Sequence, residues 1–376
     1  MNVLVNAVSI KEGGPLVVLR ELIAGMQRLQ PETRWFVAGP PPTEASCSAG
    51  SFVQVADVLQ GGPISLVDWY ERLLPSAVRR FSSDVVFSLT NYLPLRKLSC
   101  PAVLLEQHAG HFSAEFQALD RQHSVSPLQQ LAWRYKNAWV RRSVRSADKL
   151  MVQTAALADR IAASGLRPRE KIAVVAHGPG QVDRASGRSA RRGGPWRIGY
   201  LAKFGVQKNF ETLFRAARRL SDAGHDIRVV LTLDPSIASA ARTLSNARAL
   251  GIAHRIDNLG EVRVGQIQTL YDDLDIMAFC SVCESFGFPM VEAMVRGLPI
   301  VVADTPENRE ITGAAALRFA RYDDCELARH LASLIVDDAK RQRQSEQSLV
   351  RGRDFSWQRA CEQTLSVLND AVRGAP

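Results

Sequence analysis

Short apolar runs alternate with longer amphipathic segments along nearly the whole chain, and this pattern limits the fold more than any single motif. Runs such as NVLVNA at 2–7 and PIVVAD at 299–304 lack the regular change between polar and apolar side chains that a half-exposed strand shows. Continuous apolar strands separated by helices are typical of parallel sheets covered by helices on both faces. The sequence therefore predicts an α/β protein built from βαβ units.

A polar stretch at 178–195, rich in Gly, Arg and Ser, interrupts the pattern and predicts a linker or an exposed loop. Because 376 residues exceed what one hydrophobic core usually supports, the two flanking stretches predict two doubly wound domains. The carboxyl ends of their strands, where ligands of such sheets bind, would face one cleft. Before the polar stretch we predict strands at 2–7, 34–39, 84–89, 102–107, 149–154 and 171–177, with helices at 15–29, 65–79, 127–146 and 155–164. After it we predict strands at 196–202, 227–233, 255–260, 274–280 and 299–304, with helices at 209–222, 235–249, 264–272, 289–296, 324–337 and 355–372.

The chain carries 47 Lys and Arg against 38 Asp and Glu, a net charge of +9 that favours anionic partners. Basic clusters lie at 133–145, 186–194 and 340–344, and each can also be explained as a solvated face. Only 133–145 combines aromatic side chains with the helical spacing of an interfacial helix, which makes contact with an anionic membrane surface one alternative. No nucleic-acid-binding module is recognisable, so we expect no nucleic-acid partner.

The expected location follows from apolar length and cysteine spacing. No apolar run reaches the roughly 18 residues of a membrane-spanning helix, and the first residues lack the basic and apolar regions of a signal peptide. The six cysteines show no repeated spacing, and Cys280 and Cys283 are better explained as buried strand-end residues than as half of a zinc site. We expect a cytoplasmic protein, either free or peripheral at the inner face of the membrane.

The segment CESFGFPMVEAMVRGLPIVVAD follows the buried apolar run at 274–280. Glu284 should therefore lie just past the carboxyl end of a strand, where ligands bind. Gly287 permits a tight turn, and Pro289 suits the first position of a helix. The backbone N–H groups at 286–290 would then form an anion site at the start of that helix.

Glu284 and Glu292 stand on either side of this expected anion site. A carboxylate accepts hydrogen bonds from vicinal hydroxyls, so the two glutamates suit a sugar on one side and a ribose on the other. The alternative is that Glu292 is only a charge in the first turn of a helix and that Glu284 is a solvated loop residue.

Two strand–helix junctions offer further features for binding a phosphate or a sugar. Lys203 and Lys208 bracket the loop after the first strand of the second half, where two cations suit the diphosphate of a nucleotide. Gly13 and Gly14 lie between the first strand and its helix, where glycine lets backbone N–H groups approach a phosphate or sugar. The pattern G-x-G-x-x-G is absent, which argues against a nicotinamide or flavin enzyme.

Together these residues resemble family 4 of the glycosyltransferases, retaining enzymes with the GT-B fold. The similarity covers nearly the whole chain and is strongest at 197–318, where CESFGFPMVEAMVRGLPIVVADTPENREITGAAA is similar to the family's E-x7-E segment. The resemblance implies two Rossmann-like, doubly wound domains facing a central cleft. They would be an acceptor-binding domain at 1–180, a linker at 181–195, a nucleotide-sugar-binding domain at 196–354 and a C-terminal helix at 355–376 that crosses back to the first domain.

The resemblance also implies residue roles. Glu284 would hold hydroxyls of the donor sugar, Glu292 the nucleotide ribose, and the backbone from 286 to 289 the diphosphate. Lys203 stands where the family usually has Arg, and Lys binds phosphate as a point charge rather than bidentately. The implied nucleotide-sugar-binding residues are Gly13, Gly14, Lys203, Lys208, Ser285, Phe286, Gly287, Phe288, Pro289 and Glu292, and the implied catalytic residues are Glu284, His108 and Lys208.

The resemblance covers two histidines of the first half as well. His108, in LLEQHAGHF, would face the donor sugar from a strand end. With His111 it forms an HxxH pair for which the sequence suggests no third metal ligand. His177 stands where many members have the Asn of an Asn-Gly turn, and we expect it to serve the interdomain hinge.

The implied reaction moves a hexose, mannose or a similar sugar, from a GDP or UDP sugar to a saccharide or lipid-linked saccharide acceptor. The anomeric configuration is kept, and the product belongs to a bacterial surface polysaccharide such as lipopolysaccharide. We expect no cofactor and no metal. The alternatives are a sugar-nucleotide epimerase of the same fold and a non-catalytic sugar-nucleotide-binding protein. The presence of both Glu284 and His108 favours catalysis, because a binding protein needs neither.

Overall fold

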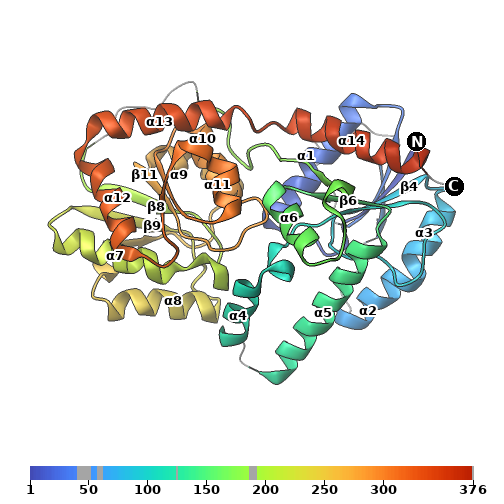
Figure 1. Ribbon diagram of the computed structural model, residues 1–376, viewed down its shortest axis with the longest axis horizontal. Coiled ribbons are helices and arrows are strands. Elements are labelled where there is room, and N and C mark those ends of the chain that lie inside the picture. The colour runs from blue at the N-terminus through green and yellow to red at the C-terminus, as the bar shows by residue number, and fades with distance from the viewer. Residues whose placement is uncertain (40–51, 57–61, 124–125, 186–192, 375–376) are drawn as a thin grey trace. The chain divides into compact units, whose positions relative to one another are not determined.

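The structure is a computed structural model (Figure 1) whose internal contacts divide the chain into two units. Each unit holds its own parallel sheet. Unit 1 comprises Met1–Gln117, Ser124–Gly178 and Ser356–Pro376, and unit 2 comprises Ala118–His123 and Pro179–Phe355. The described residues are 1–39, 52–56, 62–123, 126–185 and 193–374.

Within its described residues, unit 1 holds a seven-stranded sheet in the order β3-β2-β1-β4-β5-β6-β7. All neighbouring strands are parallel, and the strand order reverses at β1 and β4, as in doubly wound sheets that bind ligands beside such a switch point. The strands are β1 (Asn2–Asn6), β2 (Arg34–Ala38), β3 (Phe52–Ala56), β4 (Val85–Ser88), β5 (Ala102–Leu105), β6 (Lys149–Val152) and β7 (Ile172–Val174). The accompanying helices are α1 (Gly13–Leu29), α2 (Gly62–Asp68), α3 (Leu74–Arg80), α4 (Ala114–His123), α5 (Pro127–Ser146), α6 (Ala155–Ala163) and α14 (Trp357–Arg373).

Unit 2 holds a six-stranded parallel sheet in its described part, in the order β10-β9-β8-β11-β12-β13. Its strand order reverses at β8 and β11. The strands are β8 (Trp196–Tyr200), β9 (Ile227–Leu231), β10 (Ile256–Asn258), β11 (Ile276–Phe279), β12 (Ile300–Ala303) and β13 (Ala316–Phe319). The helices are α7 (Phe210–Asp222), α8 (Ala238–Ala249), α9 (Val264–Asp273), α10 (Phe288–Val295), α11 (Pro306–Thr312), α12 (Asp324–Val336) and α13 (Asp338–Gly352).

The α/β architecture is confirmed, and every predicted strand range contains an observed strand. The predicted helix at 65–79 is instead α2 and α3 joined by a π-helical turn at Trp69–Leu73. The sequence pattern does not predict α4, α11, α13, β3 or β13. Among the described residues, no helix is both long enough and apolar enough to span a bilayer.

Helix α13 escapes the hydrophobic pattern because its buried face is polar. The basic cluster at 340–344 belongs to this helix. On the inward face, the Ser345 hydroxyl donates to the Gly297 carbonyl at 2.7 Å, and the Ser348 hydroxyl donates to the Leu298 carbonyl at 2.8 Å. Small polar side chains that satisfy backbone carbonyls can be buried without cost. The helix therefore packs against the rest of unit 2, although its sequence shows little apolar periodicity.

The segment 179–185 is not the free connection that its polar composition predicts. The Ala185 N–H donates to the Val295 carbonyl at 2.9 Å, and the Arg184 guanidinium donates to the Gly352 carbonyl at 2.7 Å. These contacts attach the start of the predicted linker to unit 2. Most of the basic cluster at 186–194 lies outside the described residues.

Two segments of unit 1 that are distant in sequence pack together at His177. Its ring is buried and stacks on Trp357 with the ring centroids 5.2 Å apart. Burial lowers the pKa of His177 to about 3, so the ring is neutral near pH 7. An ideal Cβ on Gly178 would lie 2.4 Å from the Trp357 ring, so the chain leaves unit 1 beside the point where it returns. The hinge role of His177 stays a prediction.

Helix α14 packs on α1 within unit 1. The Cys361 Sγ lies 3.7 Å from the Glu21 carbonyl oxygen and 3.8 Å from that of Leu22. An ideal Cβ on Gly25 would lie only 2.3 Å from the Cys361 Sγ. The absence of a side chain at Gly25 therefore sets how closely the two helices approach.

Replacing Gly25 by Ala should destabilise the protein, although Ala normally stabilises a helix interior by about 0.5–1 kcal/mol relative to Gly. The added methyl group meets the Cys361 sulfur, which is missing in Cys361→Ala, and in that background the same change should raise the Tm. Thermal unfolding of the wild type, both single variants and the double variant measures this coupling. Equal effects of Gly25→Ala in the two backgrounds would contradict the contact.

Candidate active site

Two loops of unit 2 follow neighbouring strands and meet at one edge of the sheet. β11 pairs in parallel with β8, so the loops after both strands leave the same edge. Lys208 lies in the first loop and Glu284 in the second. The Lys208 Nζ lies 2.5 Å from the Glu284 Oε1, and the two side chains are only 15% and 12% exposed. The structure thus joins two predicted site residues in a largely buried ion pair, and Glu284 is not a solvated loop residue.

The backbone around Lys208 is held from both sides. The Tyr200 hydroxyl donates to the Lys208 carbonyl at 2.7 Å, and the Val282 N–H donates to the Gln207 carbonyl at 2.9 Å. The second bond ties the two loops together. Asn209 follows with φ +52°, a left-handed conformation that Asn tolerates better than most residues, and turns the chain into α7. These contacts place the Lys208 ammonium opposite the second loop.

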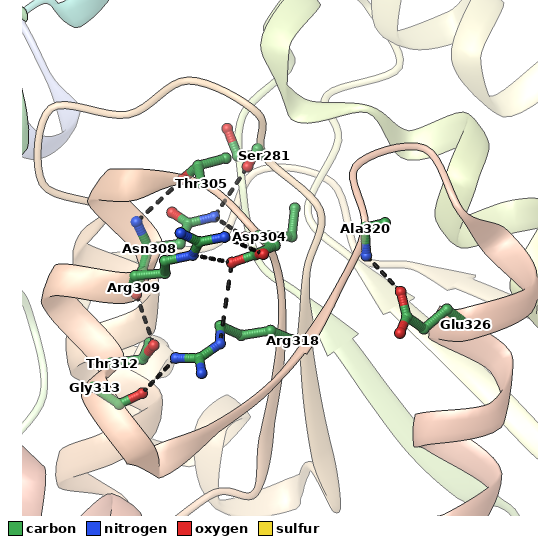
Figure 2. A network of polar contacts seen from close by, with 11 residues as sticks. Ser281, Asp304, Thr305, Asn308, Arg309, Thr312, Gly313, Arg318, Ala320 and Glu326 are labelled. Carbon is green, nitrogen blue, oxygen red and sulfur yellow. Dashed lines mark hydrogen bonds and ion pairs between the residues drawn. The ribbon is translucent and has the colours of Figure 1, made fainter.

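A polar network links the second loop to α11 (Figure 2). The buried Asn308 donates through Nδ2 to the Ser281 carbonyl at 3.1 Å and to the Ala303 carbonyl at 2.9 Å. On the solvent side, the guanidinium of Arg309 pairs with Asp304 and holds the pKa of that carboxyl below its ordinary value. The end of β12 and the loop after β11 are therefore fixed to each other.

The second loop turns into α10 at Gly287, whose φ of +81° favours glycine. The helix begins at Phe288, so Pro289 occupies the second helical position rather than the predicted first. Phe286 is buried and packs edge to face on Phe288 at 5.1 Å, while Ser285 is half-buried. The start of α10 carries the positive end of the helix dipole, which favours an anion. Pro289 has no N–H and the Met290 N–H donates to the Gly287 carbonyl at 2.9 Å, so these two residues offer a ligand no backbone donor.

Glu292 is only 7% exposed, and both of its carboxylate oxygens have donors within unit 2. Oε1 accepts from the Gln181 N–H at 2.9 Å, and Oε2 accepts from the Tyr271 hydroxyl at 2.7 Å. An ideal Cβ on Gly180 would lie 2.0 Å from Oε1, so only glycine fits where this segment passes. Burial raises the pKa of Glu292, and the two hydrogen bonds oppose that shift. Glu292 is the fifth residue of α10, beyond its first turn, so the alternative of a mere first-turn charge is wrong.

No sequence pattern indicates the two partners of Glu292. Tyr271 has the helical spacing of an ordinary core residue of α9, and Gln181 lies in a stretch that composition assigns to a linker. The glycine at 180 is the only local signal, because it marks a place where backbone approaches another group closely.

Lys203 is not joined to the Lys208–Glu284 pair. Its ammonium lies 3.3 Å from the Glu261 Oε1, and the two side chains are 54% and 67% exposed. Exposed ion pairs hold a side chain weakly. The two lysines that the sequence assigns to a diphosphate thus differ in this structure, since Lys208 is held in the site and Lys203 lies at the surface.

In unit 1, Gly13 and Gly14 form the start of α1, two residues earlier than the predicted position 15. Gly13 has φ +69°, and nothing lies within 4 Å of an ideal Cβ at this position. Backbone conformation rather than crowding therefore favours glycine here.

His108 follows β5 and is anchored through its backbone to Glu106. The His108 N–H donates to the Glu106 Oε1 at 3.0 Å. Glu106 is fully buried, and burial raises the pKa of its carboxyl well above the ordinary value, with the His108 N–H opposing the shift. Sequence reasoning missed Glu106, although a charged residue directly after an apolar run is a visible signal.

The His108 ring belongs to an aromatic cluster in unit 1. It lies 4.8 Å from the ring of His111 and 5.3 Å from that of Phe116, while His111 stacks on Trp133 at 4.7 Å. Burial, with a smaller effect of His108, lowers the pKa of His111 to about 3. Within the part of the chain that the structure describes, no group of three or more His, Cys, Asp or Glu is placed to hold a metal ion.

Two family models match the chain along most of its length. Residues 13–178 match the glycosyl transferase 4-like domain, and residues 182–350 match the glycosyl transferases group 1. The second match contains Lys208, Glu284 and Glu292. The chain belongs to family 4 of the glycosyltransferases.

Curated relatives of this glycosyltransferase include two D-inositol 3-phosphate glycosyltransferases. The protein from Corynebacterium diphtheriae is 30% identical over 181 residues, which are 46% of this chain and 42% of the relative. The protein from Corynebacterium glutamicum is 31% identical over 228 residues, 54% of this chain and 52% of the relative. An O-antigen chain mannosyltransferase B from Escherichia coli is 29% identical over 109 residues, 29% of each chain. The chain spans about half the length of the first two relatives.

Solved structures share the fold over the whole length. Sucrose-phosphate synthase from Thermosynechococcus elongatus has a TM-score of 0.77 at 13% identity and covers 100% of both chains. HepE from Anabaena, solved with UDP and glucose, has a TM-score of 0.72 at 17% identity and covers 98% of this chain and 100% of its own. The glycosyltransferase therefore has the GT-B fold, with two Rossmann-like domains.

Glu106→Gln should remove a pH dependence of stability. Because the pKa of Glu106 is raised above its ordinary 4.5 on folding, the folded chain binds this proton more tightly than the unfolded chain does. The carboxyl therefore destabilises the fold progressively as pH rises above its unfolded pKa. Glutamine keeps the oxygen that accepts from His108, so the Tm of the variant should gain on the wild type from about pH 5 to pH 8.

Thermal unfolding across this pH range measures the effect, with Glu346→Gln on α13 as the exposed control. A Tm difference between Glu106→Gln and wild type that does not change with pH would show that Glu106 is not held in its neutral form.

Proposed function

We propose that this glycosyltransferase is a retaining hexosyltransferase with a nucleotide diphosphate sugar as donor. Its acceptor is a saccharide or a lipid-linked saccharide of bacterial surface polysaccharide synthesis. The observation that carries the proposal is the buried Lys208–Glu284 pair between two loops, followed directly by the start of α10. A cation, an anion and a helix N-terminus in one place suit a ligand that carries both phosphate and hydroxyl groups.

A nucleotide sugar offers each member of the ion pair a suitable partner. Its diphosphate attracts Lys208 and the positive end of the α10 dipole, and its sugar hydroxyls donate to Glu284. In the structure the two side chains neutralise each other. Donor binding would give Lys208 the diphosphate as its charge partner and give Glu284 the sugar hydroxyls as hydrogen-bond donors, so neither charge would be left without a partner.

Glu292 is proposed to accept the ribose hydroxyls. The Tyr271 hydroxyl and the Gln181 N–H each occupy one lone pair of its carboxylate. Each oxygen retains a second lone pair for a ligand hydroxyl. Because the two protein donors fix the carboxylate, ribose binding would require little further ordering of this side chain.

In the proposed reaction, the bond between the anomeric carbon and the diphosphate oxygen breaks, and the bonding electrons leave with the diphosphate. Lys208 and the positive end of the α10 dipole stabilise that growing negative charge, so we expect no metal requirement. The acceptor hydroxyl forms the new bond to the anomeric carbon, and its proton passes to the diphosphate oxygen that leaves. His108, positioned by Glu106, is proposed to face the donor sugar.

The names of similar proteins support the donor and the pathway. HepE is solved in complex with UDP and with UDP-glucose, which supports a UDP or GDP hexose for this chain. The Escherichia coli relative is a mannosyltransferase of the O-antigen chain, which supports mannose or a similar hexose in a surface polysaccharide.

The proposed location is a reducing compartment, the cytoplasm. In its support, all the described cysteines are free, namely Cys100, Cys280, Cys283, Cys325 and Cys361.

Lys208→Ala and Glu284→Ala should each lower the transfer rate by about two orders of magnitude, the typical effect of losing one well-placed charge-stabilising group. Initial rates with a radiolabelled hexose donor measure the loss. Arg218→Ala, which breaks the exposed ion pair with Asp222 in the same unit, should keep wild-type rates. Wild-type turnover in both site variants, with their Tm unchanged, would remove the ion pair from the mechanism.

Nucleotide sugars should raise the Tm of the wild type, and sugars lacking a nucleotide should not. A ligand at 100 times its Kd stabilises a folded protein by about 2.7 kcal/mol. A screen of UDP and GDP hexoses by thermal unfolding identifies the donor, and Lys208→Ala should reduce the shift with the same donor. If no nucleotide sugar shifts the Tm, the proposed donor class is wrong.

A further inference from the structure

Helix α5 of unit 1 has two chemically different faces, and two of its three aromatic residues, Trp133 and Trp139, lie on the inner one. Trp133 stacks on His111, and the Trp139 Nε1 donates to the Leu93 carbonyl at 2.7 Å while its ring packs 5.1 Å from that of Tyr70. The tryptophans that make 133–145 resemble an interfacial helix are therefore part of the packing of unit 1. Of the three aromatic residues in 133–145, Tyr135 remains exposed on the outer face.

The outer face of α5 instead exposes a different apolar stripe. Leu128, Leu131 and Tyr135 are 77%, 46% and 71% exposed. Their spacing of three and four residues places them on one side of the helix. Exposed large apolar side chains gathered on one helix face indicate a surface that contacts a membrane or another molecule.

Charge tells which partner covers this stripe. The sequence of α5 contains no Asp or Glu, and its five cations are Arg134, Lys136, Arg141, Arg142 and Arg145. Within the described residues none of the five forms an ion pair with an acidic side chain. Near the carboxyl end of the helix, Arg142 donates to the Leu95 carbonyl. Leu95, Arg96 and Lys97 are exposed there and add one apolar and two basic side chains to this surface.

We propose that the outer face of α5, with Leu95–Lys97, docks on an anionic lipid surface. The leucines and Tyr135 would enter the boundary between headgroups and acyl chains, and the cations would contact lipid phosphates. A nucleic acid would not account for the exposed leucines. A second copy of the same face would bring cations against cations. Docking gives the enzyme access to a lipid-linked acceptor, and to that extent it rests on the proposed function.

Sedimentation of the full chain with vesicles of phosphatidylglycerol and phosphatidylcholine tests the proposal. The wild type should bind anionic vesicles and not pure phosphatidylcholine. Neutralising Arg134, Lys136 and Arg145 together to Gln should weaken the partition coefficient by about a hundredfold, roughly fivefold for each cation. Replacing Leu128, Leu131 and Tyr135 together by Ser should weaken it by at least about tenfold.

Val336→Ser with Val350→Ser removes two exposed apolar side chains of unit 2 and serves as the matched control, with binding unchanged. Both α5 variants should keep the donor-induced Tm shift, so failure of the docking proposal is distinguishable from failure of the proposed function. Equal binding of wild type to neutral vesicles, or wild-type binding by the apolar variant, would overturn the proposal. It would equally be overturned if duplex DNA bound the wild type and the apolar variant alike while vesicles did not.

Discussion

The Lys208–Glu284 ion pair is the interaction on which the rest of the active site depends. Its two residues are 76 positions apart in the sequence, and they meet because β8 and β11 are parallel neighbours whose following loops leave one edge of the sheet. A largely buried pair attracts more strongly than an exposed one. It therefore holds both loops in place and fixes a cation beside an anion at this edge of the sheet.

Buried polar contacts support this arrangement from behind. Asn308 joins the loop after β11 to α11, and Ser345 on α13 bonds to the Gly297 carbonyl just beyond α10. The segment at 179–185 contributes the backbone donor that fixes Glu292. Each of these groups satisfies a carbonyl or carboxylate that would otherwise be buried without a partner, which costs about 1–3 kcal/mol per group. The site is thus fixed by polar satisfaction as much as by apolar packing.

Unit 1 uses one helix for two purposes. The inner face of α5 stacks Trp133 on His111, beside the ring of His108, and so supports the residue proposed to face the donor sugar. The outer face exposes Leu128 and Tyr135 among cations. If that face docks on lipid, the surface contact and the packing around His108 belong to one rigid element.

The sequence alone determined every described strand except β3 and β13, because buried parallel strands must be apolar on both faces. It also determined the turn at Gly287, whose backbone conformation favours glycine. It also placed Glu284 and Glu292 around a helix start. Only the tertiary structure decided that Glu292 is held by Gln181, 111 residues away, and by Tyr271. Local patterns report burial and backbone conformation. Hydrogen-bond partners from distant segments depend instead on the spatial order of the strands in each sheet, which no local pattern encodes.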